Sequence, residues 1–116
     1  RVFQGAEKLA AWSMLAGADG LVPGLGNVAP RLAVQIYEAG KAGRESEALA
    51  LQAQLDELGT LHNHDYWVVC LKHAASLLGF GSGATTGHPV RLTEEGRTTI
   101  RNLVTAATAP VEDKLT

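Results

Sequence analysis

The chain has 116 residues, of which 46% are apolar, and ten basic against twelve acidic side chains give a formal charge of −2. This length fits one globular domain, and no apolar run reaches the roughly 20 residues that cross a bilayer. No five-residue window is dominated by Lys and Arg, so neither nucleic acid nor a membrane is an expected partner. The single cysteine, Cys70, lies in an apolar run, which favours a buried thiol and a reducing, cytoplasmic compartment.

The chain opens on Arg1 rather than Met, and Val2 and Phe3 have the composition of a strand already under way. This opening favours a piece of a longer protein, and no secretory signal is expected. The segment from Gln4 to Glu7 turns into a helix that ends at Gly17, because glycine is favoured just after a helix. That helix is apolar almost all round and therefore needs cover on two sides.

The segment from Gly17 to Pro30 organises the rest of the chain. Leu21 and Val22 form a short apolar run that predicts a buried strand, and the glycines that follow predict a loop. Pro30 then predicts the first position of a helix, where its missing N–H costs nothing. The order of helix, strand, glycine-rich loop and helix is that of the repeating unit of an α/β barrel.

Three further helices are predicted from Glu45 onward. The first has an apolar stripe that consists of Ala48, Leu51, Leu55, Leu58 and either Leu61 or His62. Asp65 is predicted to cap the second helix, which ends at Gly79 and whose apolar face is Trp67, Leu71, Ala74, Ala75 and Leu78. Thr93 is predicted to cap the third, which ends at Pro110 and whose apolar face is Ile100, Leu103, Val104 and Ala107.

Several short motifs, in this order and spacing, resemble one known family. The first three are Phe3-Gln4-Gly5-Ala6-Glu7, Leu15-Ala16-Gly17-Ala18-Asp19-Gly20 and the turn from Asn27 to Pro30. Ala48, Leu51 and Gln52 follow, then Leu71-Lys72-His73-Ala74-Ala75 with Leu78-Gly79, and finally Pro89-Val90-Arg91-Leu92-Thr93. Together they resemble the pyruvate-dependent class I aldolases, which include dihydrodipicolinate synthase and N-acetylneuraminate lyase. The resemblance covers nearly the whole chain.

The resemblance implies an α/β fold, namely the C-terminal portion of a (β/α)8 TIM barrel followed by a three-helix C-terminal appendage. Residues 1–43 would form about the last two β/α units of the barrel, and residues 44–116 the appendage. The residues agree, since five helices accompany only two short strands, and two strands cannot bury both faces of a sheet. The supplied segment is therefore expected to be mostly helical, with the other strands in N-terminal sequence outside it.

The implied function is that of a lyase, an aldolase or a related synthase that forms a Schiff base with pyruvate or another 2-keto acid. In the family the Schiff-base lysine lies on the sixth strand and the proton-relay tyrosine on the fifth, which are both outside this chain. The supplied segment alone is therefore predicted to be inactive. By resemblance, its partners would be a keto acid, the rest of the barrel and further copies in a homo-oligomer, a tetramer in this family. No cofactor or metal is implied.

By the same resemblance, five residues in the two strand-to-helix loops would bind substrate: Gly5, Glu7, Val22, Pro23 and Gly24. Gly5 would offer its backbone, and Glu7 its carboxylate, to hydroxyls of the substrate. In N-acetylneuraminate lyase an aspartate stands in place of Glu7. A hydroxyl-bearing serine stands there in place of Gly24, and its contact to sialic acid is lost here. The alternative for Glu7 is structural, because a carboxylate stabilises the N-terminal end of a helix.

Other chemical candidates have more ordinary interpretations. Gly24 and Gly26, beside a helix start, could bind phosphate, but Pro30 removes a donor and no Lys, Ser or Thr follows as in a nucleotide-binding loop. The glycines are better explained as a packed barrel rim. His62 and His64 could suggest a metal site with Asp65, but a spacing of two near a helix end does not point both imidazoles one way.

A catalytic role is not expected of two further side chains, Lys72 and Cys70. Lys72 lies in a helical pattern rather than at the end of a strand, so a Schiff base there is not expected. Cys70 has no evident base beside it, and His73 shares its helix face by chance. A second class of function stays open, an autonomous helical interaction module in which the stripe from Ala48 to Leu61 binds a partner helix. That alternative leaves the opening strand and the glycine-rich loop unexplained.

Overall fold

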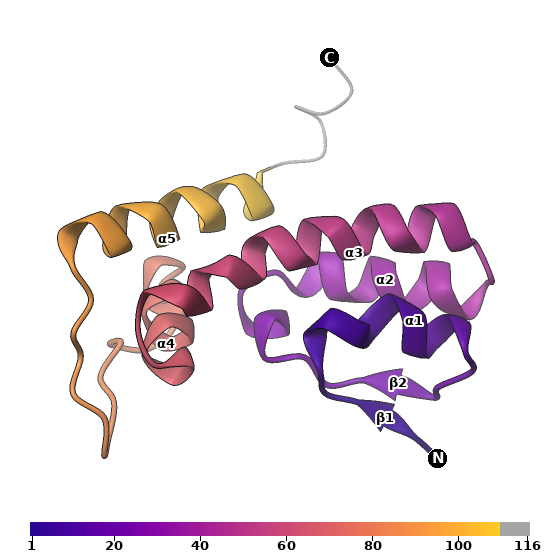
Figure 1. Cartoon of the computed structure of the whole chain (residues 1–116), viewed down its shortest axis with the longest axis horizontal. Coiled ribbons are helices and arrows are strands. Elements are labelled where there is room, and N and C mark those ends of the chain that lie inside the picture. The colour runs from indigo at the N-terminus through magenta and orange to yellow at the C-terminus, as the bar shows by residue number, and fades with distance from the viewer. Residues whose placement is uncertain (110–116) are drawn as a thin grey trace. The chain divides into compact units, whose positions relative to one another are not determined.

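The computed structural model describes residues 1–109, which divide into two compact units, Arg1–Thr60 and the segment from Leu61 onward. The first contains two short strands and three α-helices, and the second contains two α-helices joined by a long loop (Figure 1). Among the described residues, no helix is both long and apolar enough to span a membrane.

The first unit begins with a parallel pair of strands, β1 (Phe3–Gln4) and β2 (Gly20–Leu21). Phe3 pairs with Gly20 and Gln4 with Leu21, and the amide of Val22 continues the ladder by donating to the carbonyl of Gln4 at 2.9 Å. The Phe3 ring lies over Gly20: a Cβ at position 20 would come within 2.7 Å of that ring. A larger residue at position 20 would therefore displace the ring.

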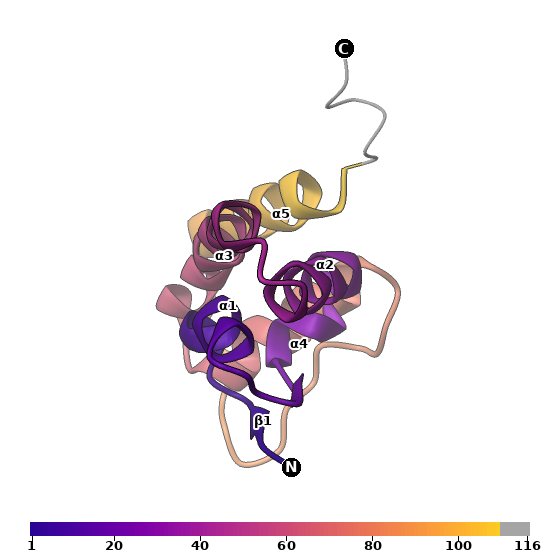
Figure 2. The ribbon, with the colours of Figure 1, turned by 90° about the vertical axis from the view of Figure 1, so that its right-hand side faces the viewer.

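Helices connect and cover the strands. A 3-10 turn, η1 (Glu7–Leu9), leads into α1 (Ala10–Leu15), and a second 3-10 turn, η2 (Gly24–Asn27), precedes α2 (Pro30–Lys41). The third helix, α3 (Glu45–Gly59), packs against both α1 and α2. In the two views the strands lie on the side of α1 and α2 that is opposite α3 (Figures 1 and 2). The unit is therefore layered, with its core between the helices; that core includes Met14, Leu25, Ile36, Ala48 and Leu55.

The second unit consists of η3 (Thr60–His64), α4 (Trp67–Leu77) and α5 (Glu94–Thr108). Helices α4 and α5 pack on each other, and the buried side chains include Val69, Cys70, Ala74, Ile100 and Val104. The long segment between α4 and α5 contains no helix or strand. It is fixed by hydrogen bonds from the flanking structure, among them one from the Arg91 amide to the Asp65 carboxylate at 2.7 Å.

Most helix ends are where the sequence predicts them. Pro30 opens α2, and the Thr93 hydroxyl caps α5 by accepting a hydrogen bond from the amide of Gly96 at 3.0 Å. Gly17 and Gly79 follow their helices with positive φ angles of 98° and 86°, the conformation expected of a glycine after a helix. The predicted end of the last helix at Pro110 lies outside the described residues.

Other local predictions were wrong in detail. Val2 and Val22 lie beside the strands rather than in them, because each strand extends only over the two residues that pair. Asp65 does not cap the helix that follows; its carboxylate accepts hydrogen bonds from the amides of Tyr66 and Arg91. Trp67, predicted on the apolar face of its helix, is 51% exposed. In α3, Gln52 is buried where the stripe was predicted to contain Leu51, which is only half-buried.

The compact units divide after Thr60, whereas the predicted domain boundary lies between residues 43 and 44. The two divisions rest on different criteria. The first unit includes α3 because α3 packs on α1 and α2, and the predicted boundary separates barrel repeats from the segment that follows them. The boundary between barrel and appendage stays a prediction.

Candidate functional site

The carboxyl ends of β1 and β2 meet at one edge of the parallel pair. Gly5 follows β1 and Val22 follows β2, and a Cβ at Gly5 would lie 3.9 Å from the Val22 carbonyl oxygen, so the two backbones are adjacent. Val22 is 68% exposed. In parallel α/β folds the loops at this edge carry the functional residues. The structure thus brings together the first residues of both predicted substrate-binding loops.

Glu7 links the two loops directly. It opens η1, immediately after β1, and its Oε1 accepts a hydrogen bond of 2.6 Å from the amide of Leu25 in the loop after β2. Leu25 is completely buried, so its amide needs a partner inside the protein. A short bond to a charged acceptor contributes about 1.5–3 kcal/mol when water is excluded. Glu7 therefore fixes the position of the second loop relative to the first.

Pro23 and Gly24 lie at the start of the loop that Glu7 holds. Pro23 precedes η2 with an extended backbone, and its carbonyl accepts a hydrogen bond from the Gly26 amide at 3.1 Å. The carbonyl of Gly24 accepts one from the side-chain amide of Asn27 at 2.9 Å. All five predicted substrate-binding residues thus belong to one edge of the sheet and to two loops joined by Glu7. Their contact with substrate stays a prediction.

The same hydrogen bonds weigh against phosphate binding at the glycine-rich turn. The amide of Leu25 is bound to Glu7, that of Gly26 to Pro23, and those of Val28 and Ala29 to the Leu25 carbonyl. A phosphate would need such amides to point outward. A carboxylate so close to the turn also repels an anion. The turn is a packed rim of the sheet, as the sequence favours.

Gln52 belongs to the residues that carry the family resemblance, but sequence reasoning gave it no role in the candidate site. It lies on α3 and is 4% exposed, and its side-chain amide bonds to the first turn of α1 and to the Glu7 carbonyl. A signal was present, because position 52 is spaced four residues after buried Ala48 and three before buried Leu55, which places it on the buried stripe. A polar side chain on that stripe needs internal partners.

The chemical candidates of the second unit have structural explanations. The Lys72 ammonium donates to the Ala84 carbonyl at 3.0 Å, which ties α4 to the loop beyond it. Burial raises the pKa of the Cys70 thiol, which keeps it protonated and unreactive. Burial, with the charges of Arg97 and Arg101, lowers the pKa of His73, so the imidazole is neutral at pH 7. Within residues 1–109, no three His, Cys, Asp or Glu side chains are grouped as metal ligands.

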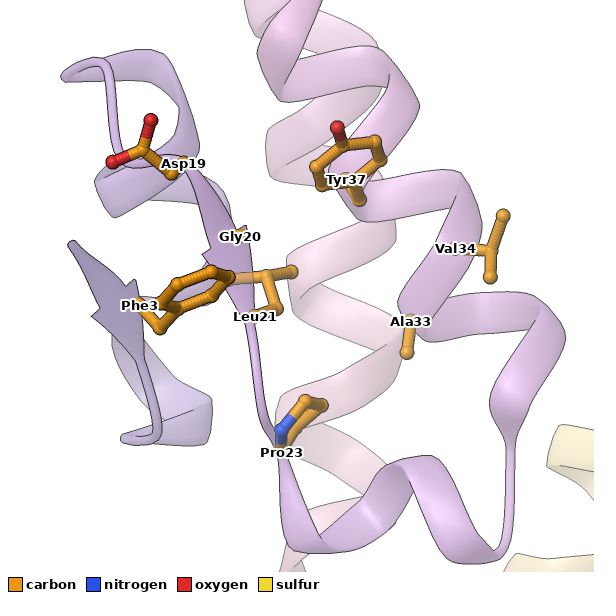
Figure 3. Close-up of a pocket in the computed structure, with 8 residues that line it drawn as sticks. All are labelled: Phe3, Asp19, Gly20, Leu21, Pro23, Ala33, Val34 and Tyr37. Carbon is orange, nitrogen blue, oxygen red and sulfur yellow. The ribbon is translucent and has the colours of Figure 1, made fainter. Parts of the chain in front are cut away.

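A shallow apolar groove lies beside β2. It is lined from one side by Phe3, Gly20 and Leu21 and from the other by residues of α2, including Ala33, Val34 and Tyr37 (Figure 3). In the described part of the chain, β1 is the only strand that pairs with β2. The opposite edge of β2 is therefore unpaired next to this groove, and Val34 is 52% exposed there. An open strand edge of this kind can pair with a further strand.

Comparison with known proteins identifies this architecture. The sequence profile of the "Dihydrodipicolinate synthetase family" matches residues 1–107. The chain belongs to this family. A curated relative, the 4-hydroxy-tetrahydrodipicolinate synthase of Gluconacetobacter diazotrophicus, is 34% identical over 101 residues, which are 81% of this chain and 32% of the relative. The chain thus spans about a third of the length of that relative.

Solved structures of the family agree with the fold. The dihydrodipicolinate synthase of Bacteroides thetaiotaomicron matches with a TM-score of 0.80 and 28% identity, over 90% of this chain and 37% of that structure. KD(P)GA from T. tenax matches with a TM-score of 0.77 and 27% identity, over 94% and 39%. The prediction of a mostly helical, C-terminal portion of a TIM barrel of the dihydrodipicolinate synthetase family is therefore confirmed.

Proposed function

We propose that this chain forms the last two β/α units and the helical appendage of a class I aldolase. The complete enzyme would act on pyruvate or another 2-keto acid through a lysine Schiff base that lies outside this chain. Family membership supports this assignment, and so do the positions of the lysines. Lys8 lies in the 3-10 turn η1, Lys41 ends α2 and Lys72 lies in α4, so none of these three lies on a strand, where the resemblance places the Schiff-base lysine; Lys114 lies outside the described residues.

The substrate contacts would come from the edge where β1 and β2 end. Gly5, Glu7, Val22, Pro23 and Gly24 would face the part of the substrate remote from the keto group. The observation that carries this proposal is the 2.6 Å bond between Glu7 and the Leu25 amide, since it holds a carboxylate and two loops together at the sheet edge. A carboxylate in that position can accept hydrogen bonds from substrate hydroxyls.

The groove beside β2 fits the rest of the barrel as a partner. If β2 is the eighth strand, a closed barrel pairs its open edge with the first strand, which would cover Leu21 and Val34. The exposed apolar side chains of this unit, such as Trp12 at 53%, would be covered in the same way or by further copies in a cytoplasmic homo-oligomer, which the resemblance implies to be a tetramer.

The alternative is an autonomous helical module that binds a partner helix through the stripe from Ala48 to Leu61. This alternative requires the stripe to be available. Ala48, Leu55 and Leu58 are at most 2% exposed, and α3 already packs on α1 and α2. The stripe is thus used within the first unit, and the enzyme remains the better-supported proposal.

Glu7→Ala in the complete enzyme tests the substrate role. We expect turnover of a polyhydroxylated substrate to fall about 10- to 100-fold, the equivalent of one charge-assisted hydrogen bond. Trapping of pyruvate by borohydride should be nearly unchanged, because the Schiff-base lysine lies elsewhere. Glu57→Ala, an exposed glutamate on α3, is the matched control. A parallel loss of trapping and turnover, or a loss of stability alone, would reduce Glu7 to a structural residue.

A further inference from the structure

Gln52 is the one buried polar side chain in the described part of the chain, and its amide oxygen and amide nitrogen both form hydrogen bonds. Its Oε1 accepts from the Ala11 amide at 2.8 Å. Its Nε2 donates to the Glu7 carbonyl and to the Asp56 carboxylate, both at 2.9 Å. Since a glutamine amide has two N–H donors, these bonds fix which way the group is turned. No other side chain of the described residues is both buried and so fully bonded.

The bond to Ala11 completes the start of α1. The first amides of a helix have no acceptor within the helix and need one from elsewhere. Ala11 lies in the first turn of α1 and is 0% exposed, so water cannot supply that acceptor. Gln52 does so from α3, which is 41 residues away along the chain. Helix α3 is therefore bonded to the point where the loop after β1 becomes a helix.

The bond to Glu7 extends this connection to the predicted substrate edge. Glu7 is held at two places, at its carbonyl by Gln52 and at its carboxylate by the Leu25 amide. A shift of the Glu7 backbone would move the carboxylate and, with it, the loop after β2. A continuous series of hydrogen bonds thus runs from α3 through Glu7 to Leu25.

We propose that Gln52 is a positioning residue through which α3 sets the place of Glu7 and of the loop after β2. The inference rests on the proposed function, because it assigns the two loops to substrate binding. Gln52 itself touches no substrate. Its effect would be on the affinity for the substrate part remote from the keto group, and not on formation of the Schiff base.

The test compares Gln52→Met and Gln52→Glu with the same two substitutions at Gln54, an exposed glutamine on the same helix. Methionine keeps the length of the side chain but forms no bond to Ala11 or Glu7. The carboxylate of Gln52→Glu can accept from Ala11 but cannot donate to Glu7. Both variants, in the complete enzyme, should speed hydrogen exchange at the Leu25 amide about tenfold and raise KM for a polyhydroxylated substrate about tenfold. The kcat and the trapping of pyruvate should stay within about twofold of the wild type.

Asp56→Ala offers a milder variant, should the buried substitutions prevent folding. Asp56 is exposed, and its loss removes only the acceptor that orients the Gln52 amide. We expect about a twofold increase in Leu25 exchange, which corresponds to the usual strength of such a pair four residues apart on a helix.

The possible results distinguish the positioning role of Gln52 from the substrate role of the loop after β2. Unchanged Leu25 exchange in folded Gln52 variants would overturn the positioning role. Faster exchange with an unchanged KM would uphold the connection from α3 to the loop and contradict the substrate role of that loop. A fall in kcat, a rise in KM and a loss of pyruvate trapping together would show general damage, and would also overturn the positioning role.

Discussion

The two compact units are held together by different kinds of contact. In the first, helix backbones approach closely: a Cβ at Gly40 of α2 would lie 2.4 Å from the Cβ of Met14 on α1, and Gln52 bonds three separate backbone or side-chain groups from within the core. In the second, side chains of α4 and its flanks hold a long loop by hydrogen bonds near the surface. Lys72 bonds to Ala84 and Asp65 to Arg91.

This difference predicts how each unit responds to change. Removing an atom from a closely packed core loses contacts and leaves a cavity, because the surrounding helices relax only in part. Adding an atom to such a core forces its neighbours apart. Exposed hydrogen bonds compete with water, so each contributes less. Substitutions in the first unit should therefore have the larger effects.

The largest effect should come from Ile36→Ala. Ile36 is 0% exposed on α2, which packs on α1, α3, η2 and β2. We expect a loss of about 3–5 kcal/mol in the free energy of unfolding, towards the upper end for a buried isoleucine, because so many neighbours prevent collapse of the cavity. Ile100→Ala, equally buried on α5, should cost about 2–3 kcal/mol. Urea unfolding measures both, and an equal cost would contradict the difference in packing.

A smaller loss of stability is expected of Gly40→Ala, which adds a methyl group to the core instead of removing atoms from it. Alanine favours a helix over glycine by about 1 kcal/mol, but the added methyl group would overlap Met14, so we expect a net loss of about 1–3 kcal/mol. Gly96→Ala in α5 is the matched substitution. Its Cβ would lie 3.3 Å from the Thr93 hydroxyl oxygen and 3.4 Å from the His64 Cβ, so the result should be within about 0.5 kcal/mol of zero. Thermal unfolding of the two variants compares them directly, and a stable Gly40→Ala would disprove the close approach.

The helix ends could be predicted from the sequence because their causes are local. Pro30 at the start of α2 and Thr93 at the start of α5 act on groups within three residues of themselves. Gly17 and Gly79 act through their own backbone conformation. The bounds of β1 and β2 were less accurate, because a strand ends where its partner ends, and the sequence of one strand does not show that.

The connections within the candidate site could not be predicted, because they join residues that are far apart along the chain. Glu7 and Leu25 are 18 residues apart, and Gln52 and Glu7 are 45 apart. The resemblance placed Gly5, Glu7, Val22, Pro23 and Gly24 in two loops, but nothing in the sequence shows that one carboxylate joins them. The same limit explains Asp65, whose side chain bonds to an amide 26 residues away instead of capping the adjacent helix.

The smallest predicted effect is a dependence on pH in the second unit. Asp65 accepts hydrogen bonds from the amides of Arg91 and Tyr66. Both bonds lower the pKa of its carboxyl below the ordinary value, and the bond from Arg91 has the larger effect. A carboxyl whose pKa is lowered on folding stabilises the protein while it is ionised. The contribution is therefore complete above the unfolded pKa of about 3.9 and is lost as the pH falls through the lower, folded pKa.

Asp65→Asn should remove this dependence. The urea midpoint of the wild type should exceed that of the variant at pH 7, and the difference should shrink as the pH falls to about 3, because protonation removes the charge that the variant lacks throughout. Glu57→Gln, at an exposed position of α3, is the matched control. A difference between wild type and Asp65→Asn that stays constant between pH 7 and pH 3 would mean that the ionised carboxylate does not hold the loop. In that case the shape of the second unit would depend on its buried helix contacts, as the first unit does, and the contrast between the two would be lost.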